Sequence, residues 1–103
     1  MELRFKAEHL RKLACDSSYD GDLPLTVVTA FRKRLQVLQA AREEQILLAL
    51  GKWLQIKRRN SGSAHHSIQI TDEWQLLLEF EDGAEERVAV IEAMVPTEKE
   101  HRS

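Results

Sequence analysis

The sequence predicts an α+β protein in which N-terminal helices pack on one face of a mainly antiparallel sheet, in the order β-α-α-β-β-β-β. Two observations predict this class. Apolar and polar residues alternate from His65 to Asp82, with the period of two that half-buried strands show. Over 25–40, apolar residues instead recur every three to four positions, which is typical of a helix with one buried face. The helical pattern precedes most of the strand patterns, so the helix must cover one face of the sheet.

The first half of the chain predicts one short strand and three helical segments. In order, these cover 2–6, 7–14, 25–40 and 41–50. Asp22 is expected to cap the main helix, and Pro24 is tolerated in a first turn because its missing N–H would be unpaired there anyway. Gly51 is expected to end the last helix. That helix has too many apolar residues for a solvated surface, so it should pack against another element or another chain.

The second half predicts the remaining strands. In order, these are a strand over 53–59, a hairpin over 65–82 that turns at 71–73, and a strand over 87–92. Val95 and Pro96 are expected to stop the sheet, so that 1–96 is a single domain and 97–103 is a disordered tail. With Trp74 on the inward face, the opposite face stays open. It carries Gln69, Gln75, Leu77 and Glu79.

Composition limits the classes of function. Apolar residues make up 43% of the chain and charged residues 31%, as in ordinary soluble proteins, and no apolar run suits a membrane span or a signal peptide. We therefore expect a cytoplasmic protein. Cys15 is the only cysteine, which excludes an internal disulfide and a cysteine-built zinc site. Because no carboxylate is suitably spaced from the histidines, we expect no metal ion, and we expect no cofactor.

The net charge of −2 is unevenly distributed along the chain. Residues 1–59 contain 12 Lys and Arg against 7 Asp and Glu, a net charge of +5, whereas residues 60–103 contain 3 against 10, a net charge of −7. Two interpretations are open. Either the two halves simply attract each other in the fold, or the first half forms a basic surface that binds a polyanion or an acidic partner.

Four stretches resemble the HigB-type killer toxins of the RelE/ParE superfamily. They are residues 28–41 (VTAFRKRLQVLQAA), 51–54 (GKWL), 66–76 (HSIQITDEWQL) and 80–83 (FEDG). The resemblance implies a RelE/ParE-like fold and the toxin of a bacterial type II toxin–antitoxin module, which cleaves mRNA on the ribosome. It also implies a cognate antitoxin, expected to be a small helix-turn-helix protein, with the ribosome and mRNA as further partners of an active toxin. It implies no membrane partner and no metal ion.

The sequence departs from the family at positions that would carry the chemistry. The family usually has arginine where this chain has Gln69 and Gln75, and its last strand usually ends in an Asp-Tyr-His-like run. The matching residues here are Glu92, Ala93 and Met94. Arginine offers phosphate a charged planar fork, whereas glutamine offers a neutral amide, so each difference removes a charge-assisted contact. Cleaving RNA by internal attack needs a base, an acid and cations, so a nuclease built on this chain must use other residues.

The candidates for catalysis are His65, His66 and Glu92, and those for RNA binding are Lys57, Arg58, Arg59, Arg32 and Arg34. Adjacent strand residues point to opposite sides, so the two histidines cannot act together. Glu92 is either the counterpart of an acidic family position or a solvated carboxylate at a sheet edge. The run 57–59 is either a phosphate-binding patch or a solvated strand edge. The basic residues 32–34 either extend that patch or form the outer face of a helix.

Two functions of different classes follow from these residues. The first is a toxin that inhibits translation by cleaving mRNA with 57–59 and one histidine. The second is a catalytically inactive protein with the toxin fold that binds an antitoxin-like partner. The missing arginines and the acidic second half favour the second function, whereas the basic run and the resemblance along the chain favour the first.

Overall fold

The structure is a computed structural model that describes residues 1–41, 49, 56–58 and 65–97. Within these residues the element order is β-α-α-β-β-β-β, and its two helices are the ones predicted over 7–14 and 25–40. The expected helix over 41–50 and the expected strand over 53–59 fall mostly outside the described residues, as does Arg59. No helix in the described part of the chain is long and apolar enough to cross a membrane.

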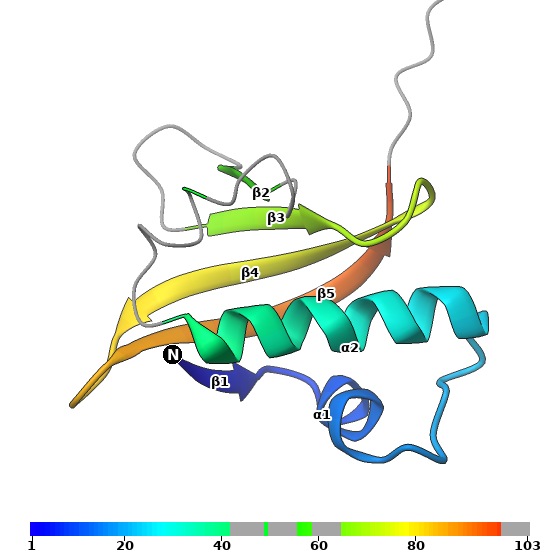
Figure 1. The fold of residues 1–103 in the computed structure, drawn as a ribbon, viewed down its shortest axis with the longest axis horizontal. Helices are drawn as coiled ribbons and strands as arrows, with labels where there is room; N and C mark the ends of the chain where they lie inside the picture. The colour runs from blue at the N-terminus through cyan, green and yellow to red at the C-terminus, as the bar shows by residue number, and fades with distance from the viewer. Residues whose placement is uncertain (42–48, 50–55, 59–64, 98–103) are drawn as a thin grey trace, which may run out of the picture.

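The described strands form a five-stranded mixed sheet in the order β1-β5-β4-β3-β2 (Figure 1). The strands are β1 (Glu2–Phe5), β2 (Ile56–Arg58), β3 (His65–Gln69), β4 (Trp74–Asp82) and β5 (Arg87–Pro96). β1 pairs with β5 in parallel, and the other three pairings are antiparallel. The predicted α+β class with a mainly antiparallel sheet is therefore confirmed.

The central hairpin turns where the sequence predicts. The N–H groups of Ile70 and Thr71 donate to the Trp74 carbonyl at 2.9 and 3.1 Å. This short connection sets the register of β3 and β4, and a shift by one residue would exchange the two faces of both strands. In the observed register Gln69 lies opposite Gln75, and the pairing continues to the far end of β3.

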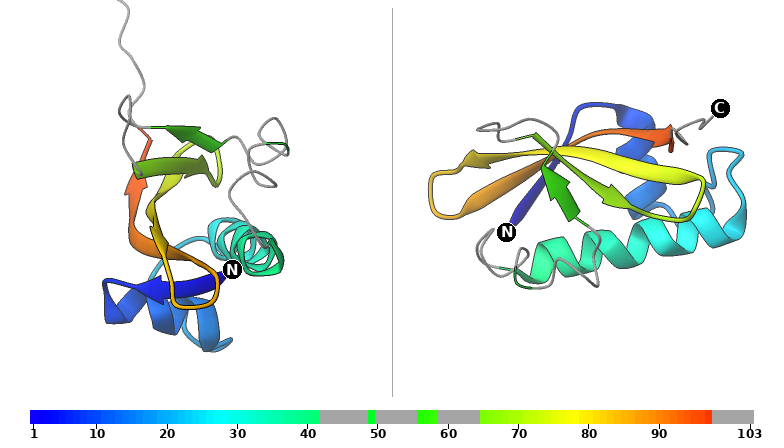
Figure 2. Two further views of the ribbon diagram at one scale, coloured as in Figure 1. Left: turned by 90° about the vertical axis from the view of Figure 1, so that its left-hand side faces the viewer. Right: turned by 90° about the horizontal axis from the view of Figure 1, so that it is seen from above.

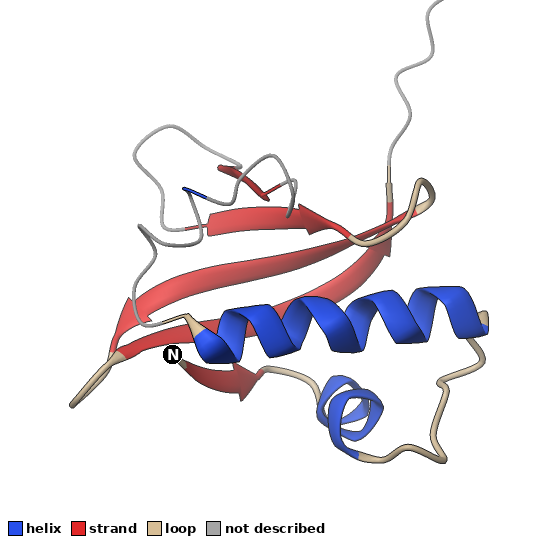
Figure 3. Cartoon of the chain, in the orientation of Figure 1, coloured by secondary structure: helices blue, strands red, loops and turns tan. Residues whose placement is uncertain are grey.

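Two described helices, α1 (Glu8–Cys15) and α2 (Leu25–Ala40), come before most of the sheet in the chain (Figure 3). α2 lies along one side of the curved sheet, as the end-on view shows (Figure 2). Its apolar stripe is fully buried and consists of Val27, Val28, Phe31, Leu35 and Leu38. These side chains pack in one core with Ile68, Leu76 and Leu78 of the hairpin, each of which is 0% exposed.

α2 begins without the predicted Asp22 cap. Pro24 occupies the N-cap position, and no side chain makes a capping hydrogen bond there. Gly21 and Asp22 both have positive φ, 59° and 62°, and the Asp22 N–H donates to Asp20 Oδ1 at 2.9 Å. Asp22 therefore belongs to a tight turn ahead of the helix, a left-handed position that aspartate tolerates better than most residues. The prediction of an Asp22 cap was wrong for this reason.

β5 extends beyond the predicted end at Glu92. It continues to Pro96, which lies opposite Trp74 in the ladder and is tolerated because it is the last residue of its strand. Thr97 is also held in place, since its N–H donates to the Glu73 carbonyl at 2.8 Å. The predicted strand end at Glu92 was therefore wrong, whereas the strand does end at Pro96, where the sequence predicts that the sheet stops. Residues 98–103 lie outside the described residues.

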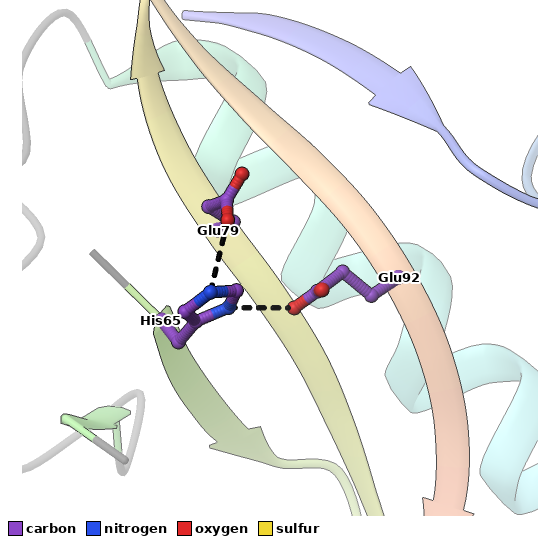
Figure 4. A group of neighbouring side chains, drawn as sticks. All are labelled: His65, Glu79 and Glu92. Atoms are coloured by element: carbon purple, nitrogen blue, oxygen red, sulfur yellow. Dashed lines mark hydrogen bonds and ion pairs between the residues drawn. The ribbon is translucent and has the colours of Figure 1, made fainter. Parts of the chain in front are cut away.

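A β-bulge interrupts the pairing of β4 with β5. Leu77 lies opposite Ala93, but Leu78 lies opposite Ile91, so Glu92 is an extra residue between these two pairs. A bulge leaves one residue out of the ladder and re-aims its side chain. The Glu92 side chain reaches the face of the sheet away from α2, where it meets a residue of β3 (Figure 4).

Candidate active site

The face of the sheet away from α2 is the open one, as the sequence predicts. In Figure 4 this face is toward the viewer, and α2 lies behind the strands. Six side chains of β3 and β4 point to it and are intermediate in exposure: His65, Ser67, Gln69, Gln75, Leu77 and Glu79. Their neighbours hold them in position while leaving part of each side chain accessible to a ligand.

His65 lies between two carboxylates on this face (Figure 4). Its Nε2 is 3.0 Å from Glu79 Oε2, and its Nδ1 is 3.4 Å from Glu92 Oε1. Lys6 Nζ lies 3.3 Å from the other oxygen of Glu92. The carboxylate side chains are only 22% and 16% exposed, whereas the imidazole is 37% exposed. The cluster therefore combines shielded acidic groups with an accessible histidine.

Four strands bring this cluster together. The hairpin register places His65 of β3 directly opposite Glu79 of β4, on the same face. Val90 of β5 lies opposite Glu79, so strand alternation points Glu92, two residues further on, to the same face, and the bulge leaves Glu92 without a partner on β4. Lys6 follows the end of β1, and its N–H continues the pairing by donating to the Ile91 carbonyl at 2.9 Å. The site thus depends on long-range strand order, with partners far apart in the sequence.

The arrangement suits proton transfer. An ionised carboxylate can only accept hydrogen bonds, so both ring nitrogens of His65 donate when the imidazole carries two protons. The protonated ring is then a potential general acid, and the glutamates beside it are potential general bases. The half-buried position strengthens these charge interactions relative to fully solvated groups.

His66 does not belong to this cluster. It is 2% exposed on the inward face, and its ring meets the ring of Phe80 edge-on at 4.9 Å between centroids. As the alternation predicts, the two adjacent histidines lie on opposite sides of β3. The placement of His66 in the core removes it from the candidates for contact with a substrate on the open face.

A shallow hollow of about 640 Å³ lies beside the cluster on the open face. Lys57 lines it and lies opposite Ser67 in the ladder, two positions along β3 from His65. The other lining residues are Ser67, Gln69, Gln75, Leu77, Val95, Pro96 and Thr97. The hollow therefore offers one cation, several neutral polar groups and an apolar wall next to the acid–base cluster.

Gln69 uses its amide within the fold. Its Nε2 donates to the Thr71 carbonyl, to the Trp74 carbonyl at 3.2 Å and to Thr97 Oγ1 at 2.7 Å. The side chain ties the hairpin turn to the end of β5. Gln75 lies opposite Gln69 and lines the hollow. The family usually has arginine at both positions. Here Gln69 has a structural role, and Gln75 faces the hollow.

The arginines of α2 do not join Lys57. The Arg32 guanidinium donates to the backbone carbonyls of Leu13 at 2.9 Å, Asp16 at 3.0 Å and Tyr19 at 3.1 Å. It therefore holds the end of α1 and the loop that follows. Arg34 is on the same helix, which packs on the other face of the sheet. Of the two interpretations of 32–34, this placement favours the outer face of a helix, because Lys57 lines the hollow on the opposite face of the sheet.

The rest of the basic run divides between described and undescribed residues. Arg58 is in β2 and lies opposite His66 in the ladder, whereas Lys57 lies opposite Ser67. Arg59 lies outside the described residues. Lys57 is the member of the run that the structure places at the open face.

Sequence reasoning also misjudged the carboxylates. Of the two interpretations of Glu92, the solvated carboxylate at a sheet edge was wrong, because β5 is an inner strand and Glu92 contacts Lys6 and His65. The counterpart of an acidic family position stays a prediction. Glu79 and Lys6 were not predicted to act at a site. The signal for Glu79 was available, because a hairpin that pairs 69 with 75 also pairs 65 with 79. No signal in the sequence indicates the bulge at Glu92.

The same three side chains, His65, Glu79 and Glu92, also form a group with the donor types that metal ions use. The expectation that no carboxylate is suitably placed beside a histidine was therefore wrong, because both carboxylates come from other strands. In comparisons with known proteins, the sequence matches no protein family and no curated protein.

Proposed function

We propose that the chain is a RelE/ParE-like toxin of the HigB type, from a bacterial type II toxin–antitoxin module, which inhibits translation by cleaving mRNA. The observation that carries this proposal is the position of His65 between Glu79 and Glu92 on the open sheet face. The element order, which the resemblance also predicts, supports it. Such a toxin acts in the cytoplasm, with the ribosome, mRNA and a small helix-turn-helix antitoxin as partners.

Cleavage by internal attack moves two protons. Glu79 accepts the proton of the 2′-hydroxyl, whose oxygen attacks the neighbouring phosphorus atom. The bond from phosphorus to the 5′-oxygen breaks, and protonated His65 gives its Nε2 proton to that oxygen. The products are a 2′,3′-cyclic phosphate and a free 5′-hydroxyl. RNA must enter between the two groups, so their 3.0 Å contact in the free protein opens on binding.

Glu92 acts through His65 as a positioning residue. A carboxylate at Nδ1 holds an imidazole in one orientation, which leaves Nε2 to react. Lys6 fixes Glu92 from the other side at 3.3 Å. Lys6 and Lys57 also put positive charge on the face that carries the cluster, where the phosphates of a nucleic acid would lie.

The test is an in vitro translation reaction with purified protein, read by product yield and by mapping mRNA ends. His65→Ala and Glu79→Gln are each expected to lower cleavage by about 10²–10⁴-fold, the usual contribution of an acid or base. Glu92→Gln should lower kcat more than it raises KM, because its effect passes through His65. Glu81→Gln is the matched control, since Glu81 is on β4 with similar exposure and outside the cluster.

Cleavage that persists unchanged in His65→Ala contradicts the acid–base mechanism. A wild-type chain that neither inhibits translation nor cleaves mRNA contradicts the toxin function itself. Thermal unfolding of every variant separates a lost group from a lost fold.

A second candidate is a catalytically inactive module that binds an antitoxin-like partner. The amide of Gln69 and the guanidinium of Arg32 are both engaged inside the fold, which favours this candidate because neither group is available to phosphate. Co-purification of a small partner from the native source, encoded by a neighbouring gene, supports it when no cleavage is found. Failure to recover any partner counts against it.

A further inference from the structure

Three neighbouring strands contribute one metal-type ligand each to the same point on the open face. The candidate ligand atoms of His65, Glu79 and Glu92 all lie within 4.8 Å of one another. We propose that these three side chains bind one divalent transition-metal ion, for which Zn²⁺ is the probe. The inference does not rest on the toxin function, because binding is measured without RNA or ribosomes.

The donor set fits zinc. An imidazole nitrogen with two carboxylate oxygens is a combination that zinc accepts, at bond lengths of about 2.0–2.2 Å. Tetrahedral bonds of that length put neighbouring ligand atoms ~3.4 Å apart. Separations up to 4.8 Å must therefore shrink by roughly 1.4 Å. Glutamate has three side-chain torsions, so rotamer changes can supply this movement without moving the strands.

One ion can take only one nitrogen of the imidazole. Nε2 faces Glu79 at 3.0 Å, so an ion bound to Nε2 has a carboxylate beside it. Such an ion takes the place of the Nε2 proton that the cleavage step uses, so the metal-bound and the acid forms of His65 are alternative states. Glu92 then either turns its carboxylate to the ion or accepts the Nδ1 proton from behind, as carboxylates commonly do for metal-bound histidines. All three side chains contribute in both arrangements. The exposed side of His65 leaves space for water to complete the coordination.

The charges around the cluster predict whether each substitution raises or lowers the affinity for a metal ion. Glu79 and Glu92 supply two negative charges that attract a divalent cation, whereas Lys6 Nζ sits 3.3 Å from Glu92 and opposes it. Lys6 is 54% exposed at its side chain, so it can move aside when an ion arrives. Removing its charge should therefore strengthen metal binding, although it removes an ion pair from the protein alone.

The experiment is calorimetric titration of the purified chain with ZnCl₂, with Co²⁺ absorption as a second readout of inner-sphere coordination. The wild type is expected to bind one ion. His65→Ala, Glu79→Gln and Glu92→Gln should each weaken binding by about tenfold or more. Lys6→Ala should bind more tightly than the wild type. His9→Ala and Glu81→Gln are matched controls away from the cluster and should leave the affinity unchanged.

Three results would overturn the inference. These are no saturable binding of Zn²⁺, binding that survives His65→Ala, and binding that His9→Ala weakens as much as His65→Ala does. Circular dichroism of each variant checks folding, and the two glutamine variants keep the test valid if His65→Ala does not fold. Metal binding without any RNA cleavage supports the metal site and contradicts only the toxin function. RNA cleavage without metal binding contradicts the metal site and supports the toxin function.

Discussion

Replacing Gln69 by alanine tests whether its side chain is part of the fold rather than of the site. The amide nitrogen has two hydrogens and three acceptors within reach, so about two hydrogen bonds are lost, each with a net contribution of about 0.5–1.5 kcal/mol. The Trp74 carbonyl keeps the N–H donors of Ile70 and Thr71, so no buried acceptor is left without a partner. We therefore expect the free energy of unfolding to fall by about 1–3 kcal/mol.

Urea denaturation followed by tryptophan fluorescence measures this change by linear extrapolation. Gln75→Ala is the matched control, because Gln75 lies opposite Gln69 and has similar exposure but no such clamp among the described residues. Its effect should stay within about 0.5 kcal/mol. Equal effects of the two substitutions, or a Gln69→Ala protein as stable as the wild type, would refute the assignment of a structural role to Gln69.

Three further predictions concern the fold around the site. Arg32→Ala should lower the free energy of unfolding by about 2–3 kcal/mol in urea because it releases charge-assisted bonds to three carbonyls, whereas the exposed Lys33→Ala should not. Ser18 lowers the pKa of Asp16 through its hydroxyl at 2.6 Å and its N–H at 2.9 Å. The resulting stability is present above the ordinary pKa of an aspartate and is lost as pH falls through the lowered one. Ser18→Ala should raise the pKa of Asp16 in an NMR titration, and an unchanged value would contradict this cause. His66→Ala should cost about 2 kcal/mol or more in thermal or urea unfolding, by leaving a cavity, and should spare any RNA cleavage.

Local patterns predicted the elements well because each is encoded by a short stretch. The alternation of Ile68, Leu76 and Leu78 with polar residues fixed one buried face of the hairpin, and these side chains are fully buried. The four-residue steps of α2 likewise gave its buried stripe. The Asp22 cap failed because capping depends on backbone dihedrals that composition does not specify. The predicted end of β5 at Glu92 was too early, because the strand continues to Pro96, and proline is tolerated as the last residue of a strand.

The site was only partly predictable. His65 and Glu92 were candidates by residue type, but their proximity depends on β4 lying between β3 and β5 in the sheet. Periodicity describes one strand at a time and carries no information on which strands are neighbours. Arg32 was an RNA-binding candidate because a cation on a helix surface looks available to a ligand in the sequence. Its hydrogen bonds to the end of α1 become known only from the structure.

The bulge in β5 has a consequence for how this protein can change over evolution. At the bulge, Glu92 has no paired residue on β4. Deleting it would therefore restore regular pairing of Ile91 and Ala93 with the neighbouring strand. A single codon deletion could thus erase one carboxylate of the cluster while every core side chain kept its face. Chemistry and architecture are separable at this position, so related chains that share the sheet can differ in whether they carry the site at all.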